Sequence, residues 1–256
     1  MRIVVLVKHV PWTTRDMSFG ADHLLDRTAR RGQLDEIDEY AVDQAVRIAR
    51  RRRDVQITAV TMGPAPAVEA LRKALILGAD EAVHVVDGRL RGSDALTTAR
   101  VLTAAVRRLG FDLVLSGAAS SDAGAAAVPA MVAELLGIPV LCFADLLRVR
   151  EHRVEIGRDD GAGLRAYVAA LPAVVSVTER CGEPRLPSLA ATLDAHHKLV
   201  RTWSLADLGI AERGADGTVV RAVRAQPGGT AHLVPGDEPT VAAIRLADFL
   251  AVHQFL

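Results

Sequence analysis

The chain has 256 residues, half of them hydrophobic, and its 31 basic residues balance its 31 acidic residues. This length fits one large domain, or one domain with a C-terminal appendage. The zero net charge argues against nucleic acid as the main partner, because no global positive field would attract phosphates. No apolar stretch reaches the length of a membrane span, so we expect no membrane insertion. The two cysteines, Cys142 and Cys181, lack metal-ligand spacing and the N-terminus lacks a signal-peptide pattern, which together predict a cytoplasmic protein with reduced thiols.

Strand and helix patterns alternate over the first 140 residues. Short β-branched runs predict buried parallel strands, and apolar residues at helical spacing predict helices between them. The expected strands are residues 2–7, 55–62, 81–86 and 112–117. The expected helices are residues 37–52, 67–77, 96–109 after a cap at Ser93, and 128–135. This alternation predicts an α/β fold with a doubly wound, mostly parallel sheet, which binds ligands outside the carboxyl ends of its strands.

The pattern changes after residue 140. Residues 146–160 look like a hairpin around Glu151, and residues 164–179 look like two strand segments broken at Pro172. We therefore expect antiparallel strands to be added to the sheet. A short helix is expected at residues 189–195, and another element at residues 240–252. We divide the chain into an α/β domain, residues 1–199, and an extended C-terminal arm with a terminal helix, residues 200–256, which lies on its own domain or on a partner.

A run of small residues, 117–128, follows the fourth strand and precedes a helix. Small side chains let the backbone approach a ligand, and a helix N-terminus presents free N–H groups, so the run is either a phosphate cradle or a packing corner. It is neither a Walker motif nor a GxGxxG fingerprint. Ser120, Ser121 and Asp122 could suggest a catalytic nucleophile. However, no histidine is near them in the sequence and they do not form a nucleophile-elbow motif. With no acid/base pair and no metal-ligand set, the sequence favours a binding or carrier protein over a hydrolase.

A short basic run, Arg50 to Arg53, lies at the end of an expected helix. Cations are favourable near a helix C-terminus, so we interpret this run as a solvated helix end.

Several motifs in order resemble one known family. They are "RIVVLVKHV" at the N-terminus, "LDEIDEYAVDQAVRI", "AVTMGPAPAVEALRKALILGADEAVHV", "VEIGRDDGAGLRAYVAALPAVVSVTE" and "EPRLPSLAATLDAHHK". Together they resemble the β subunit of electron transfer flavoproteins over roughly residues 1–210. Each motif alone is weak, whereas their order makes the resemblance specific.

The resemblance implies an adenine-nucleotide-binding, Rossmann-like fold and a heterodimer with an α subunit that holds most of the redox-active FAD. Such a carrier is not an enzyme by itself. It accepts electrons from dehydrogenases and passes them to a quinone-linked or other acceptor, and the C-terminal arm would pack on the α subunit. The β subunit usually holds AMP, with adenine beside Leu6 and Met62 and a loop around the ribose and phosphate. By motif position, the cofactor-binding residues are Leu6, Asp35, Glu36, Ile37, Asp38, Met62, Gly117, Ala118, Ala119, Ser120, Ser121, Asp122, Ala123, Gly124, Ala125, Ala126, Ala127 and Val128.

The same resemblance places Leu189 where the family has an exposed leucine that docks partner dehydrogenases. An exposed apolar anchor is physically suited to docking. The alternative is an ordinary core leucine of the expected helix.

The chain departs from the family at its phosphate loop. Ala123, Ala125 and Ala127 stand where relatives have polar side chains, and Asp35 and Glu36 stand where Asn and Pro are expected. Binding would then depend on backbone N–H groups with Ser120 and Ser121, while Asp122 suits a ribose hydroxyl. Some relatives instead bind a second FAD here and bifurcate electrons from NADH. The sequence leaves AMP, a second FAD, or no tightly held nucleotide as alternatives. It also leaves two other functions: a Fix-type bifurcating subunit or a stand-alone adenine-nucleotide sensor.

Overall fold

The computed structural model describes residues 1–13, 17–27, 32–210, 233–234, 238–253 and 255. Two compact units make up the chain, Met1–Val220 and Arg221–Leu256. Residues 200–210, assigned to the arm from sequence, therefore lie in the first unit. The expected arm also includes residues 211–232, which lie outside the described residues. Packing of the C-terminal part on a partner subunit stays a prediction.

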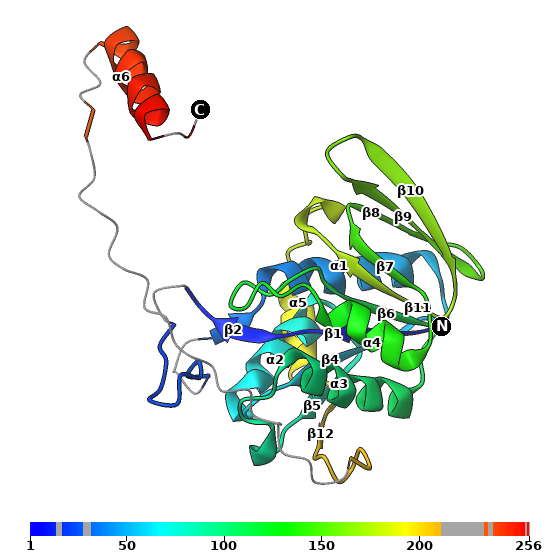
Figure 1. The fold of residues 1–256 in the computed structure, drawn as a ribbon. Coiled ribbons are helices and arrows are strands. Elements are labelled where there is room, and N and C mark those ends of the chain that lie inside the picture. Colours follow the sequence, from blue (N-terminus) through cyan, green and yellow to red (C-terminus); the bar gives the residue numbers. More distant parts are fainter. Residues whose placement is uncertain (14–16, 28–31, 211–232, 235–237, 254, 256) are drawn as a thin grey trace. The chain divides into compact units, whose positions relative to one another are not determined.

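The first unit is built on a seven-stranded sheet in the order β12-β5-β4-β1-β6-β11-β7, in which all pairings are parallel (Figure 1). The sheet explains the apolar runs in the sequence, because parallel strands are buried on both faces. Its strands are β1 (Arg2–Leu6), β4 (Gln56–Met62), β5 (Glu81–Val85), β6 (Leu113–Gly117), β7 (Val140–Ala144), β11 (Ala173–Val177) and β12 (Val200–Trp203). The four strands expected in the first 140 residues are confirmed, each within one residue.

Helices cover both faces of this sheet. One core cluster joins alternate strand residues such as Ile3 and Val5 to α1 and α2, and the other joins Val4 and Leu6 to α3 and α4. The prediction of a doubly wound α/β fold is confirmed. The helices of this unit are α1 (Glu36–Arg51), α2 (Val68–Leu77), α3 (Ala95–Leu109), α4 (Val128–Leu136) and α5 (Leu189–Ala195), with 3₁₀ turns at Ala65–Ala67, Gly88–Leu90 and Glu179–Cys181.

Local chemistry sets the helix ends. Asp35 caps α1 by accepting the backbone N–H of Ile37, and the first turn is acidic while the last is basic, which suits the helix dipole. The helix α3 is capped by Asp94, whose carboxylate accepts the N–H of Thr97. The expected cap at Ser93 is wrong, because the Ser93 hydroxyl donates to the carbonyl of Leu90 instead.

The antiparallel strands form separate small sheets. The expected hairpin is confirmed as β8 (Leu146–Val149) and β9 (Arg153–Asp159), which with β10 (Leu164–Ala170) makes a three-stranded sheet. The expectation that such strands extend the main sheet is wrong. The next strand, β11, is apolar and fully buried, and it enters between β6 and β7, parallel to both. A short pair, β2 (His9–Pro11) and β3 (Gly32–Leu34), flanks the polar stretch near the N-terminus.

The second unit contains one described element, the helix α6 (Pro239–Val252). It confirms the helical element expected at residues 240–252. No helix among the described residues is long and apolar enough to cross a membrane.

Candidate functional site

The order of the strands fixes one switch point. From β1 the chain moves through β4 to β5 on one side, and then returns to β6 on the other side of β1. The switch point lies between β1 and β6, where doubly wound sheets bind ligands outside the carboxyl ends of their strands. Leu6 and Gly117 end these two strands, and Met62 ends the adjacent β4. Three of the predicted site positions therefore share one edge of the sheet.

Asp38, in the first turn of α1, bridges the two strand ends. Its carboxylate accepts the backbone N–H of Lys8 at 2.7 Å and that of Gly117 at 2.9 Å. The side chain is buried, and this burial, with the negative charge of Asp35 as the second cause, raises the pKa of Asp38 to about 7. Glycine is needed opposite it, because a Cβ on Gly117 would lie 2.7 Å from the Asp38 Oδ1 atom.

Asp35 ties the same helix to the loop after β6. One of its oxygens accepts both the backbone N–H of Ser121 at 2.7 Å and the Ser121 hydroxyl at 2.8 Å. The side chain of Ile37 lies beside Gly117, whereas Glu36 is exposed. Of the four predicted positions at the start of α1, Asp35 and Asp38 therefore hold the loop through hydrogen bonds.

Asp122 is the centre of an ion-pair cluster. Its side chain is 0% exposed, with the Lys8 Nζ atom 2.6 Å from one oxygen and an Arg27 nitrogen 2.7 Å from the other. Lys8 also donates to the hydroxyl of Ser120 at 3.0 Å. Burial opposes ionisation of Asp122, but the hydrogen bond and charge of Lys8 and the charge of Arg27 outweigh it and lower the pKa of Asp122. Asp122 was expected to suit a ribose hydroxyl, whereas in the structure both of its oxygens pair with cations.

Lys8 directly follows the first strand, and from the sequence we count the stretch Leu6 to Lys8 among the candidate ligand contacts at the strand ends. The ion pairs of Asp122 with Lys8 and with Arg27 were not expected from the sequence. Arg27 gave no signal, because it lies in a polar stretch without periodicity.

The backbone of the small-residue loop offers hydrogen-bond donors. Within the protein, the N–H groups of Gly117, Ala118, Ser121 and Gly124 donate to Asp38, Val177, Asp35 and Ser120 respectively. The start of α4 has no side-chain cap, and Ala126 adopts a positive φ of 50° just before it. Among the described residues, no protein acceptor meets the N–H groups of Ala119, Ser120, Asp122, Ala123, Ala125, Ala126, Ala127 and Val128. Free donors at a helix start are suited to an anion.

Leu6, Met62 and Ser116 point to the same side of the sheet. Leu6 and Met62 belong to the apolar cluster under α3 and α4, and Ser116 pairs in register with Leu6. Leu6 is buried and Met62 is half-buried. The Ser116 hydroxyl is buried without a hydrogen-bond partner in the described protein. An unpaired buried hydroxyl beside two apolar side chains fits a ligand that has both apolar surface and polar atoms.

Leu189 lies apart from this edge, as the first residue of α5 after the cap residue Ser188. Its side chain is 76% exposed, so the alternative of a core leucine is excluded. Leu186 and Leu193 are exposed as well. Leu189 and Leu193 lie about one turn apart on α5, and Leu186 lies in the segment just before the helix, so this region exposes apolar surface of the kind that marks interaction sites.

Over the described ranges there is no group of three or more His, Cys, Asp or Glu residues that could hold a metal ion.

Fold and site together define a doubly wound α/β protein of the kind that places small ligands at its switch point. The family model for the electron transfer flavoprotein domain matches residues 22–208. The chain is 41% identical over 216 residues to the electron transfer flavoprotein subunit beta of Mycobacterium leprae, with 81% of this chain and 80% of the relative covered. It is 40% identical over 215 residues to that of Mycobacterium tuberculosis, with the same coverage.

A third relative has a different name. The caffeyl-CoA reductase-Etf complex subunit CarD of Acetobacterium woodii is 28% identical over 211 residues, covering 82% of this chain and 80% of the relative. The matches show that the chain belongs to the electron transfer flavoprotein β subunit family. It is therefore one subunit of an electron-transport flavoprotein. Membership of this family implies an α-subunit partner and a flavin in the complex of the two subunits.

Proposed function

We propose that this chain is the β half of a two-subunit electron carrier that holds AMP in its own fold. The α subunit supplies most of the FAD site, flavin dehydrogenases donate electrons, and a quinone-linked or other acceptor receives them. The observation that supports this most is the loop from Gly117 to Val128, fastened by Asp35 and Asp38 at the switch point with backbone donors left free.

The described residues fit AMP in two respects. Leu6 and Met62 offer apolar surface for adenine, with the unpaired hydroxyl of Ser116 on the same side of the sheet. The free N–H groups of Ala125 to Val128, at the uncapped start of α4, suit a phosphate. With alanine at positions 123, 125 and 127, a phosphate here would depend on these backbone donors.

Asp122 works against phosphate binding in the observed arrangement. Its carboxylate neutralises Lys8 and Arg27, the two cations nearest the loop. A phosphate that approaches the loop meets the negative potential of Asp122 and Asp35 unless it takes Lys8 or Arg27 for itself. We therefore propose that AMP binding exchanges at least one of these ion pairs for a pair with the phosphate.

FAD supplies the redox chemistry of the complex when it is bound. This chain positions the cofactor and takes no chemical part in the reaction itself. We further propose that dehydrogenases dock on α5 through Leu189. The exposed side chains of Leu186, Leu189 and Leu193 support this, because a few anchor residues usually carry most of the affinity of such a contact.

Coexpression with the α subunit encoded by the same organism tests the carrier function. The proposal expects a stable yellow heterodimer whose flavin spectrum bleaches when a purified flavin dehydrogenase and its substrate are added. A stable colourless monomer that takes up no flavin in the presence of the α subunit would contradict it, and would favour the stand-alone adenine-nucleotide sensor.

A second candidate is the β subunit of a Fix-type bifurcating flavoprotein, with FAD in place of AMP. The similarity to the reductase-Etf complex subunit CarD favours it, although the mycobacterial relatives named as subunit beta are more similar in sequence. The two candidates differ in the number of FAD molecules per heterodimer.

A further inference from the structure

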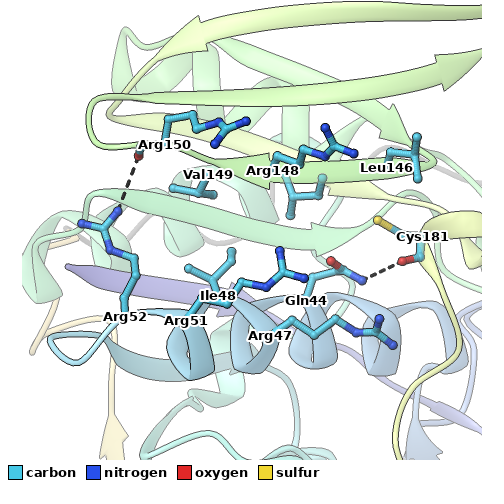
Figure 2. A pocket seen from close by; sticks show the side chains of 11 residues that line it. Gln44, Arg47, Ile48, Arg51, Arg52, Leu146, Arg148, Val149, Arg150 and Cys181 are labelled. Atoms are coloured by element: carbon cyan, nitrogen blue, oxygen red, sulfur yellow. Dashed lines mark hydrogen bonds between the residues drawn. The ribbon is translucent and has the colours of Figure 1, made fainter.

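A groove with a volume of about 500 Å³ lies between α1 and β8, and Figure 2 shows the helix along one side and the strand along the other. The strand side consists of five consecutive residues, 146–150. Successive side chains of a strand point to opposite faces, so five consecutive lining residues show that the groove runs along the edge of β8. The helix side includes Arg51 and Arg52, from the basic run that was interpreted as a solvated helix end.

The edge of β8 that borders this groove is unpaired. β8 is the last strand of its sheet, whose order is β10-β9-β8. In an antiparallel pair, residues that exchange backbone hydrogen bonds alternate with residues whose N–H and C=O groups point away from the neighbouring strand. Arg150 donates its N–H to the carbonyl of Arg153 at 2.8 Å, so the alternation turns the backbone groups of Leu147 and Val149 away from β9. No described residue outside β9 meets these groups.

The two faces of β8 differ in chemistry. Leu147 and Val149 pack on the main apolar cluster, to which Ile48 of α1 also belongs. Arg148 and Arg150 alternate with them along the chain and lie on the opposite, exposed face. A strand added beside β8 therefore places alternate side chains on the apolar rim of the core, and the others beside the two arginines.

The helix side of the groove is cationic. It carries Arg47, Arg51 and Arg52, and no carboxylate is among the described lining residues. Asp43 neutralises Arg47 from outside the groove. Arg52 closes one end of the groove by donating to the carbonyl of Arg150 at 3.5 Å. Arg51 makes no ion pair with any residue that the structure describes, so its charge is available to a bound group.

The exposed face of β8 has an uncompensated charge as well. Glu155 lies opposite Arg148 in the register of β8 and β9, but its carboxylate pairs with Arg153 at 2.9 Å. Over the described residues, Arg148 has no ion pair. The groove is thus flanked by one available cation on the helix and one on the strand.

We propose that this groove docks an extended, acidic segment of a partner protein, which adds a strand to the edge of β8. The backbone of the segment pairs with Leu147 and Val149, its inward side chains are apolar, and its outward carboxylates pair with Arg148 and Arg51. In this mode of recognition main-chain hydrogen bonds give affinity, and the side chains select the partner. The proposal is independent of which nucleotide the switch-point site holds and of docking at Leu189.

The test titrates a short fluorescent peptide of alternating glutamate and valine into the coexpressed heterodimer and measures its anisotropy. One control peptide has the same sequence with every backbone nitrogen methylated, which keeps the charge and removes the N–H donors. Another has lysine in place of glutamate. Hydrogen exchange followed by mass spectrometry reports on the backbone amides of residues 146–150.

The key protein variant is the double substitution Arg51→Gln with Arg148→Gln, one from each side of the groove. Its matched control is Arg50→Gln with Arg53→Gln, which removes the same charge from exposed neighbours that do not line the groove. Far-ultraviolet circular dichroism and flavin content show that both variants are folded.

The proposal expects the glutamate peptide to bind at least tenfold more tightly than either control peptide, and to slow exchange at Leu147 and Val149. The Arg51/Arg148 variant should lose at least about fivefold in affinity, since two partly exposed ion pairs are removed, whereas the Arg50/Arg53 variant should stay within twofold of the parent. Equal binding of the methylated peptide would show that charge alone acts and would overturn the proposal. So would equal affinity of all three proteins, no binding to the heterodimer, or slow exchange at both amides before any peptide is added.

Discussion

The Asp38 Oδ1 atom accepts the backbone N–H of Gly117 at 2.9 Å, and through this contact the start of α1 holds the end of β6. The other oxygen of Asp38 holds the chain just after β1 through the N–H of Lys8. A single carboxylate thus links the carboxyl ends of the two strands that flank the switch point.

Replacing Gly117 with alanine should destabilise the first unit. The new Cβ would lie 2.7 Å from Asp38 Oδ1 and 3.1 Å from the backbone of Ile37, so the carboxylate or the helix must shift. We expect a loss of about 1–3 kcal/mol in the free energy of unfolding, measured by chemical denaturation. Gly88→Ala is the control, because a Cβ there meets nothing within 4 Å, and its change should stay within about 0.5 kcal/mol. Equal losses in the two variants would show that Gly117 has no special packing role.

The raised pKa of Asp38 predicts a pH dependence of stability. Its pKa is 3.8 in the unfolded chain and about 7 in the folded protein, so the folded state binds the proton more tightly. The stability that follows is fully present below pH 4 and is lost as the pH rises to about 7. The variant Asp38→Asn lacks this titration and serves as the reference. Between pH 4 and pH 7, the unfolding free energy of the parent should fall by a few kcal/mol relative to that of Asp38→Asn.

Glu134→Gln, an exposed carboxylate on α4, serves as the control for this pH series. The difference between parent and Glu134→Gln should vary little over the same range. A difference between parent and Asp38→Asn that is also flat with pH would show that Asp38 is ionised throughout.

The alternation of strands and helices could be read from the sequence, because buried parallel strands and amphipathic helices leave strong periodic signals. The position of β11 could not, since an apolar strand after a hairpin does not state which neighbours it joins. The loop of small residues was found by composition and by its place after a strand. The pairing of Asp122 with Lys8 was not, because 114 residues separate them and only the folded sheet brings them together.

Asp122→Asn should strengthen AMP binding. The substitution removes the carboxylate that pairs with Lys8 and Arg27 and leaves both cations free for the phosphate. We expect the affinity for AMP to rise about tenfold, which corresponds to about 1.4 kcal/mol. Isothermal titration calorimetry measures both affinities, with adenosine as the control ligand. Because adenosine has no phosphate, its affinity should not rise in the variant. An equal gain for adenosine would mean that the site had merely opened, and a loss for both ligands would mean that Asp122 contacts the ribose directly.

Leu189→Ala should weaken docking of a dehydrogenase without harming the fold. The side chain is 76% exposed, so its truncation should change the unfolding free energy by less than about 0.5 kcal/mol. If Leu189 is an anchor, the concentration of carrier needed for half-maximal reduction by a flavin dehydrogenase should rise at least about tenfold. Leu199→Ala, an exposed leucine outside α5, should leave this concentration unchanged. The docking proposal fails if both variants behave like the parent.

The nucleotide content of the heterodimer tests the central proposal most directly. The complex with its α subunit is purified without added nucleotide and denatured, and the released nucleotides are quantified by mass spectrometry against the protein concentration. The account predicts one FAD and one AMP per heterodimer, with AMP absent when the α subunit is isolated alone. Two FAD molecules and no AMP would contradict it and establish the bifurcating type, whereas one FAD and no AMP would show that the loop from Gly117 to Val128 holds no nucleotide.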